Sequence, residues 1–226
     1  MDFKIEHGPV FTVLKVFLNS GETIKAESGA MVSMSTTVEL KAKTTGKGVF
    51  GAIGAMVGGE SLFSSEFTAK AEGEVILCQS TPGDIVHIKM DNGVTVFTQA
   101  GAYLAGSSNL NISAQGSLKA LMSGEGLFLS KVTANAGAGD LFIGSYGAIM
   151  VKELKAGETY IVDTGHIVAF DQSVQYKIKK ASKGLFSTFA SGEGLVGEYT
   201  GPGKIWIQTR NLSSLASAIM PFLPKK

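Results

Sequence analysis

Three glutamates recur at the same place in a repeated glycine-rich motif, and their types and spacing suggest two kinds of chemistry. The motif reads GESLF, GEGLF and GEGLV, and its glycine–glutamate pairs are Gly59-Glu60, Gly124-Glu125 and Gly192-Glu193. Three equivalent carboxylates that converge on a pseudo-threefold axis can hold a cation. The favoured interpretation is structural, because each carboxylate can accept backbone N–H bonds of a tight turn and Ca²⁺ requires more oxygens than this spacing supplies.

The other reactive residues form no catalytic or metal-binding pattern. Residues 46–51, GKGVFG, match the dinucleotide fingerprint, but strands are predicted on both sides where the fingerprint requires a strand and a helix. His7, His87 and His166 lack metal-ligand spacing, and Cys78 lies in an apolar run without a disulfide partner. The sequence therefore predicts a protein that is not an enzyme and that has no cofactor or metal.

A candidate interaction surface precedes each repeated turn, where basic residues run into apolar ones. Its apolar residues are Phe50, Ile53, Met56, Val57, Leu121, Met122, Leu185, Phe186 and Phe189. The basic residues beside them are Lys43, Lys47, Lys119, Lys179, Lys180 and Lys183. Three interpretations stay open: the surface is buried against the C-terminal helix or a neighbouring subunit, it docks a partner protein, or it contacts an anionic membrane surface.

The composition is that of a folded chain. Its 226 residues are 44% hydrophobic and 17% charged, with 29 glycines and one cysteine, which excludes both an intrinsically disordered chain and a disulfide scaffold. The net charge of +1 argues against nucleic acid as a partner. The N-terminus lacks the features of a secretory signal, and the apolar stretch 48–59 is too short to span a membrane. We therefore expect a cytoplasmic protein, with peripheral membrane contact as the alternative.

An internal repeat organises these residues. SGETIKAESGAM reappears as NGVTVFTQAGAY and as AGETYIVDTGHI, and EGEVIL reappears as GAGDLFI and GPGKIWI. We expect three similar β-sandwich modules around a pseudo-threefold axis, at residues 1–82, 83–146 and 147–210, with an apolar glycine-rich insertion in the first. A helical tail at residues 211–226 follows them.

Local patterns predict strands within the modules and a helix in the tail. VFTVLKVFL, DIVHIKM and AIMVKEL are rich in branched and aromatic residues, and VELKAK alternates apolar with polar residues. Turn signals every ~8–12 residues favour a sandwich or barrel. In the tail, Leu212, Leu215, Ala216 and Ile219 share one helical face, and Pro221 ends the helix.

The motifs resemble those of a known family over nearly the whole chain. ESGAMVSM, GGESLF, QAGAYLAGS, SGEGLF, VDTGHIVAF and SGEGLVGEYTGPG are similar to a bacterial and archaeal family of uncharacterised proteins related to the mitochondrial "altered inheritance of mitochondria" protein. The resemblance implies an all-β fold with modules like the tryptophan RNA-binding attenuation protein. It implies no catalytic residue, and the attenuator's tryptophan and RNA sites do not transfer, because they belong to a different sequence pattern.

These observations predict a non-enzymatic scaffold or interaction protein. We expect a homo-oligomer whose further partner is a protein or an anionic membrane surface, and we expect no nucleic acid. The alternative is a small-molecule-binding protein with its ligand between modules or subunits.

Overall fold

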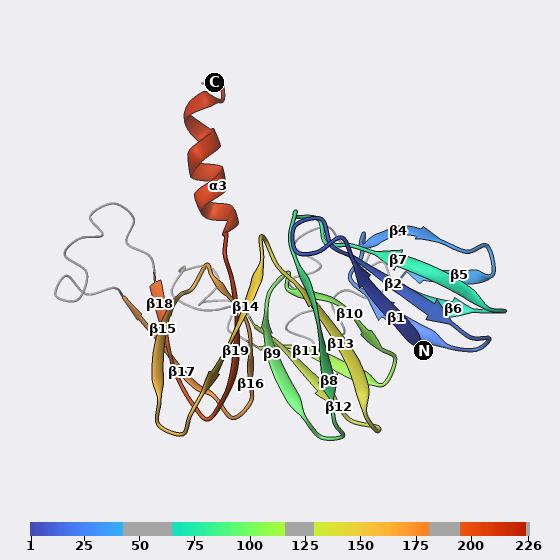
Figure 1. The fold of residues 1–226 in the computed structure, drawn as a ribbon, viewed down its shortest axis with the longest axis horizontal. Helices are drawn as coiled ribbons and strands as arrows, with labels where there is room; N and C mark the ends of the chain where they lie inside the picture. The colour runs from blue at the N-terminus through green and yellow to red at the C-terminus, as the bar shows by residue number, and fades with distance from the viewer. Residues whose placement is uncertain (43–64, 116–128, 181–194, 225–226) are drawn as a thin grey trace.

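A computed structural model describes residues 1–42, 65–115, 129–180 and 195–224 of the chain. The described part is almost entirely β, with nineteen strands and one short α-helix near the C-terminal end (Figure 1). The all-β class with a C-terminal helix, expected from the residue patterns, is confirmed.

The strands form four antiparallel sheets. The first contains, in spatial order, β1 (Asp2–Glu6), β2 (Val13–Leu18), β7 (Gly73–Leu77) and β4 (Met31–Met34). The second contains β5 (Val38–Ala42), β6 (Ser65–Ala69), β3 (Thr23–Ala26), β10 (Tyr103–Ser107), β13 (Gly139–Gly144) and β8 (Ile85–Met90). The third contains β11 (Leu110–Gln115), β12 (Leu129–Ala134), β9 (Thr95–Gln99), β16 (Ile167–Asp171), β19 (Gly203–Gln208) and β14 (Ile149–Leu154). The fourth contains β15 (Thr159–Asp163), β18 (Leu195–Thr200) and β17 (Gln175–Lys180).

The same strand pairing occurs three times along the chain. Three strands pair as β2-β7-β4, then as β8-β13-β10, and then as β14-β19-β16. Three others pair as β3-β6-β5, then as β9-β12-β11, and then as β15-β18-β17. We call β2–β7 module 1, β8–β13 module 2 and β14–β19 module 3. The divisions placed after residues 82 and 146 fall between these groups of strands.

The modules join edge to edge. β3 of module 1 pairs with β10 of module 2, and β9 of module 2 pairs with β16 of module 3. The hydrophobic cores cross the same junctions, because Leu104 and Phe142 pack into the core of module 1 and Val168 and Trp206 pack into that of module 2. Each of these two modules is therefore completed by side chains from the module that follows it.

One turn geometry follows the first strand of every module. Gly21, Gly93 and Gly157 lie in these turns with φ of 84°, 83° and 76°. Only glycine adopts such left-handed backbone without a steric cost, which explains why glycine recurs at this point of the repeat.

The segments that enter the modules form a row of their own. Phe11, Gly83 and Gly147 each lie two residues before the first strand of a module, and parallel β-bridges link Phe11 to Gly83 and Gly83 to Gly147. The Thr12 amide donates to the Gly83 carbonyl at 3.2 Å, and the Asp84 amide donates to the Gly147 carbonyl at 3.0 Å. Gly83 is the middle member of this row.

The three modules do not close into a ring within one chain. A closed threefold arrangement requires a third junction, between β15 and β4, and these two strands do not pair among the described strands. Figure 1 shows β4 and β15 at opposite ends of the molecule. The described strands therefore form two of the three junctions that a closed threefold arrangement has.

The C-terminal helix α3 (Leu212–Ile219) begins at Asn211, whose side-chain oxygen accepts the Ser214 amide at 2.7 Å. A single 3₁₀ turn, η1 (Met220–Phe222), follows it. α3 stands away from the sheets in Figure 1, and all of its side chains are exposed, including those of Leu212, Leu215 and Ile219. Neither described helix is long and apolar enough to cross a lipid bilayer.

Candidate functional site

β4 and β15 differ from every other edge strand of the described fold. The counterparts of β4 in the other modules are β10 and β16, and both pair across a junction with the preceding module. The counterparts of β15 are β3 and β9, which form the other side of the same junctions. Among the described strands, only β4 and β15 have an unpaired edge that is paired in both counterparts.

The side chains of β4 show what that missing partner would cover. Met31 is 40% exposed and Val32 is 55% exposed. Val32 corresponds to Leu104 in β10 and to Val168 in β16, whose exposed fractions are 0% and 1%. The side chain at this strand position is therefore buried in the core at both internal junctions and exposed on β4, at the outer end of module 1.

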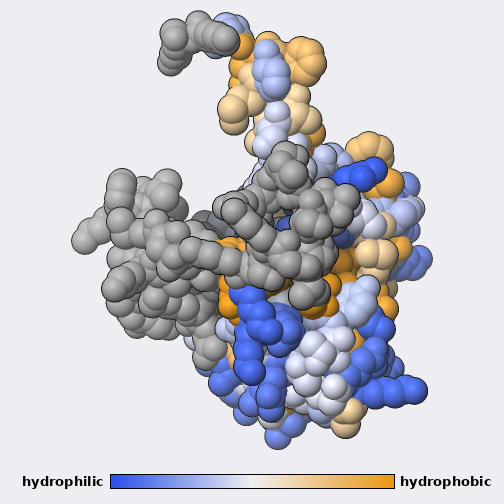
Figure 2. All heavy atoms as spheres, turned by 90° about the vertical axis from the view of Figure 1, so that its left-hand side faces the viewer, coloured by the Kyte–Doolittle hydropathy of each residue, from blue (hydrophilic) through white to orange (hydrophobic). Residues whose placement is uncertain are grey.

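β15 shows the same contrast at the other end of the molecule. Tyr160 and Ile161 are each 41% exposed, whereas Ile24 and Val96, which correspond to Tyr160, are fully buried. Figure 2 looks at the end of the molecule that carries β15 and shows hydrophobic surface among the hydrophilic side chains there. We call the exposed edges of β4 and β15 the open edges.

A cavity of about 280 Å³, with both polar and apolar lining, lies where the modules and the start of α3 meet. Its lining comes from the strand ends and turns at the module junctions, and from the residues that begin α3. The principal lining side chains are Glu27, Gln79, Gln99, Tyr146, Gln208 and Asn211.

Glutamine side chains hold the turns around this cavity. The Gln79 amide donates to the Gly101 carbonyl at 2.7 Å, and the Gln99 amide donates to the Thr164 carbonyl at 3.2 Å. The Gln208 amide donates to the Gly165 carbonyl at 2.9 Å. These amide nitrogens position one turn against the next, so the cavity wall is preformed.

Glu27 is the only charged residue in the described lining of the cavity. Its carboxylate has no hydrogen bond or ion pair to another described residue, and burial raises its pKa from 4.5 to about 7. Burial also raises the pKa of the nearby Tyr103 hydroxyl, and the charge of Glu27 adds to that rise. Glu27 therefore changes between a neutral donor and an unpaired carboxylate near neutral pH.

We expect Glu27→Gln to stabilise the protein at pH 8 and to have little effect at pH 4. Because the pKa of Glu27 is higher in the folded chain, its contribution is favourable below 4.5 and is lost as the pH rises to about 7. The gain at pH 8 should be about 1–2 kcal/mol, since partial exposure of the carboxylate reduces the desolvation penalty. Urea unfolding from pH 4 to pH 8 measures it, and parallel stability curves for the two proteins would contradict the assignment.

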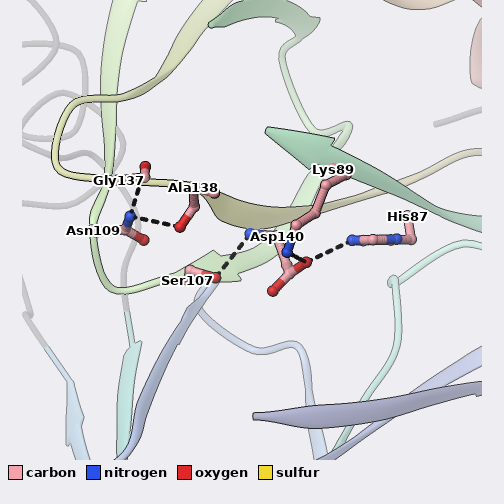
Figure 3. A network of polar contacts seen from close by, with 7 residues as sticks. All are labelled: His87, Lys89, Ser107, Asn109, Gly137, Ala138 and Asp140. Carbon is pink, nitrogen blue, oxygen red and sulfur yellow. Dashed lines mark hydrogen bonds and ion pairs between the residues drawn. The ribbon is translucent and has the colours of Figure 1, made fainter. Parts of the chain in front are cut away.

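The histidines have structural contacts. His87 Nε2 lies 2.8 Å from Asp140 Oδ1, and Lys89 Nζ lies 3.0 Å from the same oxygen (Figure 3). Burial raises the pKa of Asp140, but the bonds from Lys89 and His87 outweigh it and leave the pKa below its ordinary value. The His87 ring also packs against the rings of Phe3 and Phe142. His87 thus supports the junction of modules 1 and 2.

His166 has the corresponding structural role at the start of the tail. Its Nδ1 lies 2.8 Å from the Gln208 carbonyl, and its Nε2 lies 2.8 Å from the Asn211 amide. Among the described residues, no three His, Cys, Asp or Glu side chains cluster closely enough to hold a metal ion. Cys78 is a half-buried free thiol.

Most residues of the candidate surface and of the repeated turns lie outside the described residues. This applies to all nine apolar residues, to the three Gly-Glu pairs, and to Lys43, Lys47, Lys119 and Lys183. Lys179 lies on β17 and forms an ion pair with Glu198 at 2.6 Å, and Lys180 ends the same strand. The structure does not test the predicted apolar surface.

The open edges and Glu27 were not singled out from the sequence. The signal for the edges was present, since Met31, Val32 and Met34 are as apolar as their counterparts in the repeat. No sequence signal marked Glu27. Its carboxylate lacks a partner among the described residues because of how turns from all three modules surround it.

Comparison with known proteins places the chain in a family. A family model described as mitochondrial biogenesis AIM24 matches residues 3–210. This chain belongs to the AIM24 family. It is 33% identical over 233 residues to an uncharacterized protein of Streptococcus pyogenes serotype M6, a match that covers 99% of this chain and 92% of that relative.

The AIM24 fold is also represented by a solved structure. The X-ray crystal structure of another Streptococcus pyogenes protein superposes with a TM-score of 0.81 at 30% sequence identity. The match covers 98% of this chain and 99% of that one. The family resemblance read from the repeated motifs is therefore confirmed.

Proposed function

We propose that this AIM24-family protein is a non-enzymatic scaffold that binds its partners by strand addition at the open edges. The observation that carries the proposal is the contrast in burial: apolar side chains that are core at both internal junctions are exposed on β4 and β15. An unpaired edge offers a row of backbone donors and acceptors, and exposed apolar side chains add affinity once a strand pairs there.

The open edges lack two residues that commonly block strand pairing, lysine and proline. Natural edge strands are commonly blocked by lysine, proline or an inward-pointing charge. β4 reads MVSM and β15 reads TYIVD, so neither contains a lysine or a proline. Strand edges of this kind support the proposal that another strand pairs with them in the functional state of the protein. Its expected place of action is the cytoplasm, with peripheral contact to an anionic membrane as the alternative.

The test compares edge variants with matched variants on other strands that end their sheets. Val32→Lys and Ile161→Lys place a charge on the open edges. Leu40→Lys on β5 changes an exposed residue on a strand whose counterparts, β11 and β17, also end their sheets. Val151→Lys on β14 changes an exposed residue on a strand whose counterpart β8 also ends a sheet, whereas its counterpart β2 pairs with β1. We expect native complexes isolated from the source cell to retain the two control variants and to lose the two edge variants.

The contradicting result is equally specific. If Val32→Lys and Ile161→Lys enter the same native complexes, in the same amounts, as Leu40→Lys and Val151→Lys, then partners do not bind at the open edges. Circular dichroism of each purified variant establishes that a lost complex does not reflect a lost fold.

A second candidate function is binding of a small cation in the cavity between the modules. It is favoured by one observation, the unpaired Glu27 carboxylate in the lining of this cavity. A partly buried carboxylate without a partner is best satisfied by a positively charged ligand. Ethylammonium chloride should raise the Tm of the wild-type protein at pH 8 above the value in sodium chloride of equal ionic strength. The Tm of Glu27→Gln should not respond, and equal shifts in both proteins would exclude the site.

A further inference from the structure

We infer that the partner of the open edges is a second copy of this chain, with β15 of one copy paired to β4 of the next. This inference rests on the proposed function, and it names the occupant of the open edges. Each chain has one edge of each kind, and the two internal junctions already show how such edges fit together. The pairing continues the module-to-module sheets from chain to chain.

The two internal junctions have the same register. Aligned on the turn glycines Gly21, Gly93 and Gly157, β3 corresponds to β9 and β15, and β4 corresponds to β10 and β16. At the first junction Gly106 lies opposite Lys25. At the second junction the equivalent residues, Phe170 and Phe97, lie opposite each other. A register that recurs at both junctions is a property of the module.

Applied to the open edges, that register predicts which residues meet. Met34 of the second copy lies opposite Ile161 of the first, and Ser33 lies opposite Val162. Both members of the first pair are apolar and more than one third exposed in the single chain. Their counterparts Phe97 and Phe170 stack with ring centroids 5.3 Å apart, which shows that side chains at this position contact across the junction.

The backbone of β4 is already shaped for this pairing. β10 and β16 each have a register shift against their central strand, at Tyr103/Ala105 and at Ile167/Ala169. β4 has the same irregularity against β7, at Met31/Ser33. The strand that lacks a partner thus has the bulge of the strands that have one.

Packing supports the same partner. The core of module 1 is completed from module 2 by Leu104, Phe142 and Ile85. The residues at the equivalent places in module 1 are Val32, Ile76 and Val13, all of them apolar and none of them fully buried. A second copy would place these three side chains over the core of module 3.

The contact joins unlike surfaces, so it is heterologous. Such assemblies form a ring when the rotation between copies closes, and an open filament when it does not. In either case every copy uses both of its open edges, except at the ends of a filament.

The experiment uses purified full-length protein in a Cys78→Ser background. Met34→Cys and Ile161→Cys are prepared as separate variants and are mixed under mild oxidation. Residues directly opposite each other on antiparallel strands are close enough for a disulfide. We expect a disulfide-linked two-chain product from the mixture and from neither variant alone. Leu40→Cys mixed with Ile161→Cys is the matched control and should give none.

Native mass spectrometry of the unmodified protein is the second measurement. We expect masses at multiples of the 23.6 kDa chain, and a return to the single-chain mass in Val32→Lys. A single-chain mass for the unmodified protein, together with no cross-link in the Met34→Cys and Ile161→Cys mixture, overturns the self-pairing. If native complexes still depend on Val32 in that case, the scaffold function stands and the open edges bind another protein.

Discussion

Gly83→Ala is expected to lower the free energy of unfolding by at least about 3 kcal/mol. An alanine Cβ at Gly83 would overlap the backbone carbonyl oxygen of Ser145 and would lie 2.7 Å from its carbonyl carbon. Because both obstructing atoms belong to the backbone, no side-chain rotation relieves the overlap. Gly83 also forms β-bridges on both sides, to Phe11 and to Gly147, so any movement separates the entry segments of all three modules.

Chemical denaturation of Gly83→Ala beside Gly8→Ala measures this effect. Gly8 is also in an entry segment, but the nearest atom to its added Cβ is the Thr12 hydroxyl at 3.4 Å, an ordinary contact. We expect the Gly8 variant to stay within about 1 kcal/mol of the parent protein. Equal stability of the two variants would show that the row of entry segments can move to accept the added Cβ without a loss in the free energy of unfolding.

The second large effect is expected for Phe142→Ala, which should lower the free energy of unfolding by about 3–5 kcal/mol. The Phe142 ring is fully buried in the core of module 1 although it belongs to module 2, and it meets the Phe3 ring edge-on at 4.8 Å. Its removal leaves a cavity at the junction that strand pairing prevents from collapsing.

Ile76→Ala is the matched control, because Ile76 holds the same place in module 1, where it is only half-buried. In dilute protein this change should cost roughly 1 kcal/mol. Its cost should grow with protein concentration if a second copy covers Ile76, whereas the cost of Phe142→Ala should not depend on concentration. Equal losses for the two variants in dilute protein would contradict the difference in their burial.

The features that the sequence predicted are those set by local chemistry. The recurrence of Gly21, Gly93 and Gly157 indicated a repeated turn, because left-handed backbone requires glycine wherever the chain turns in this way. The tail helix followed from the 3.6-residue spacing of Leu212, Leu215 and Ile219. That pattern also suggested a packed face, but these side chains are exposed in the single chain.

The features that the sequence did not predict depend on contacts between distant segments. Strand alternation does not say which edge of β3 meets which edge of β10, since register is set by residues about 80 positions apart. The isolation of Glu27 has the same origin: its neighbours Gln99 and Asn211 come from module 2 and from the tail. The predicted apolar surface lies in segments that the structure does not describe.

The sharing of cores between modules has a consequence for biosynthesis. Module 1 cannot complete its core until Phe142 has left the ribosome, because Ile85, Leu104 and Phe142 are all part of that core. Module 2 in turn waits for Trp206 of module 3. Folding of modules 1 and 2 during translation must therefore lag synthesis by about one module.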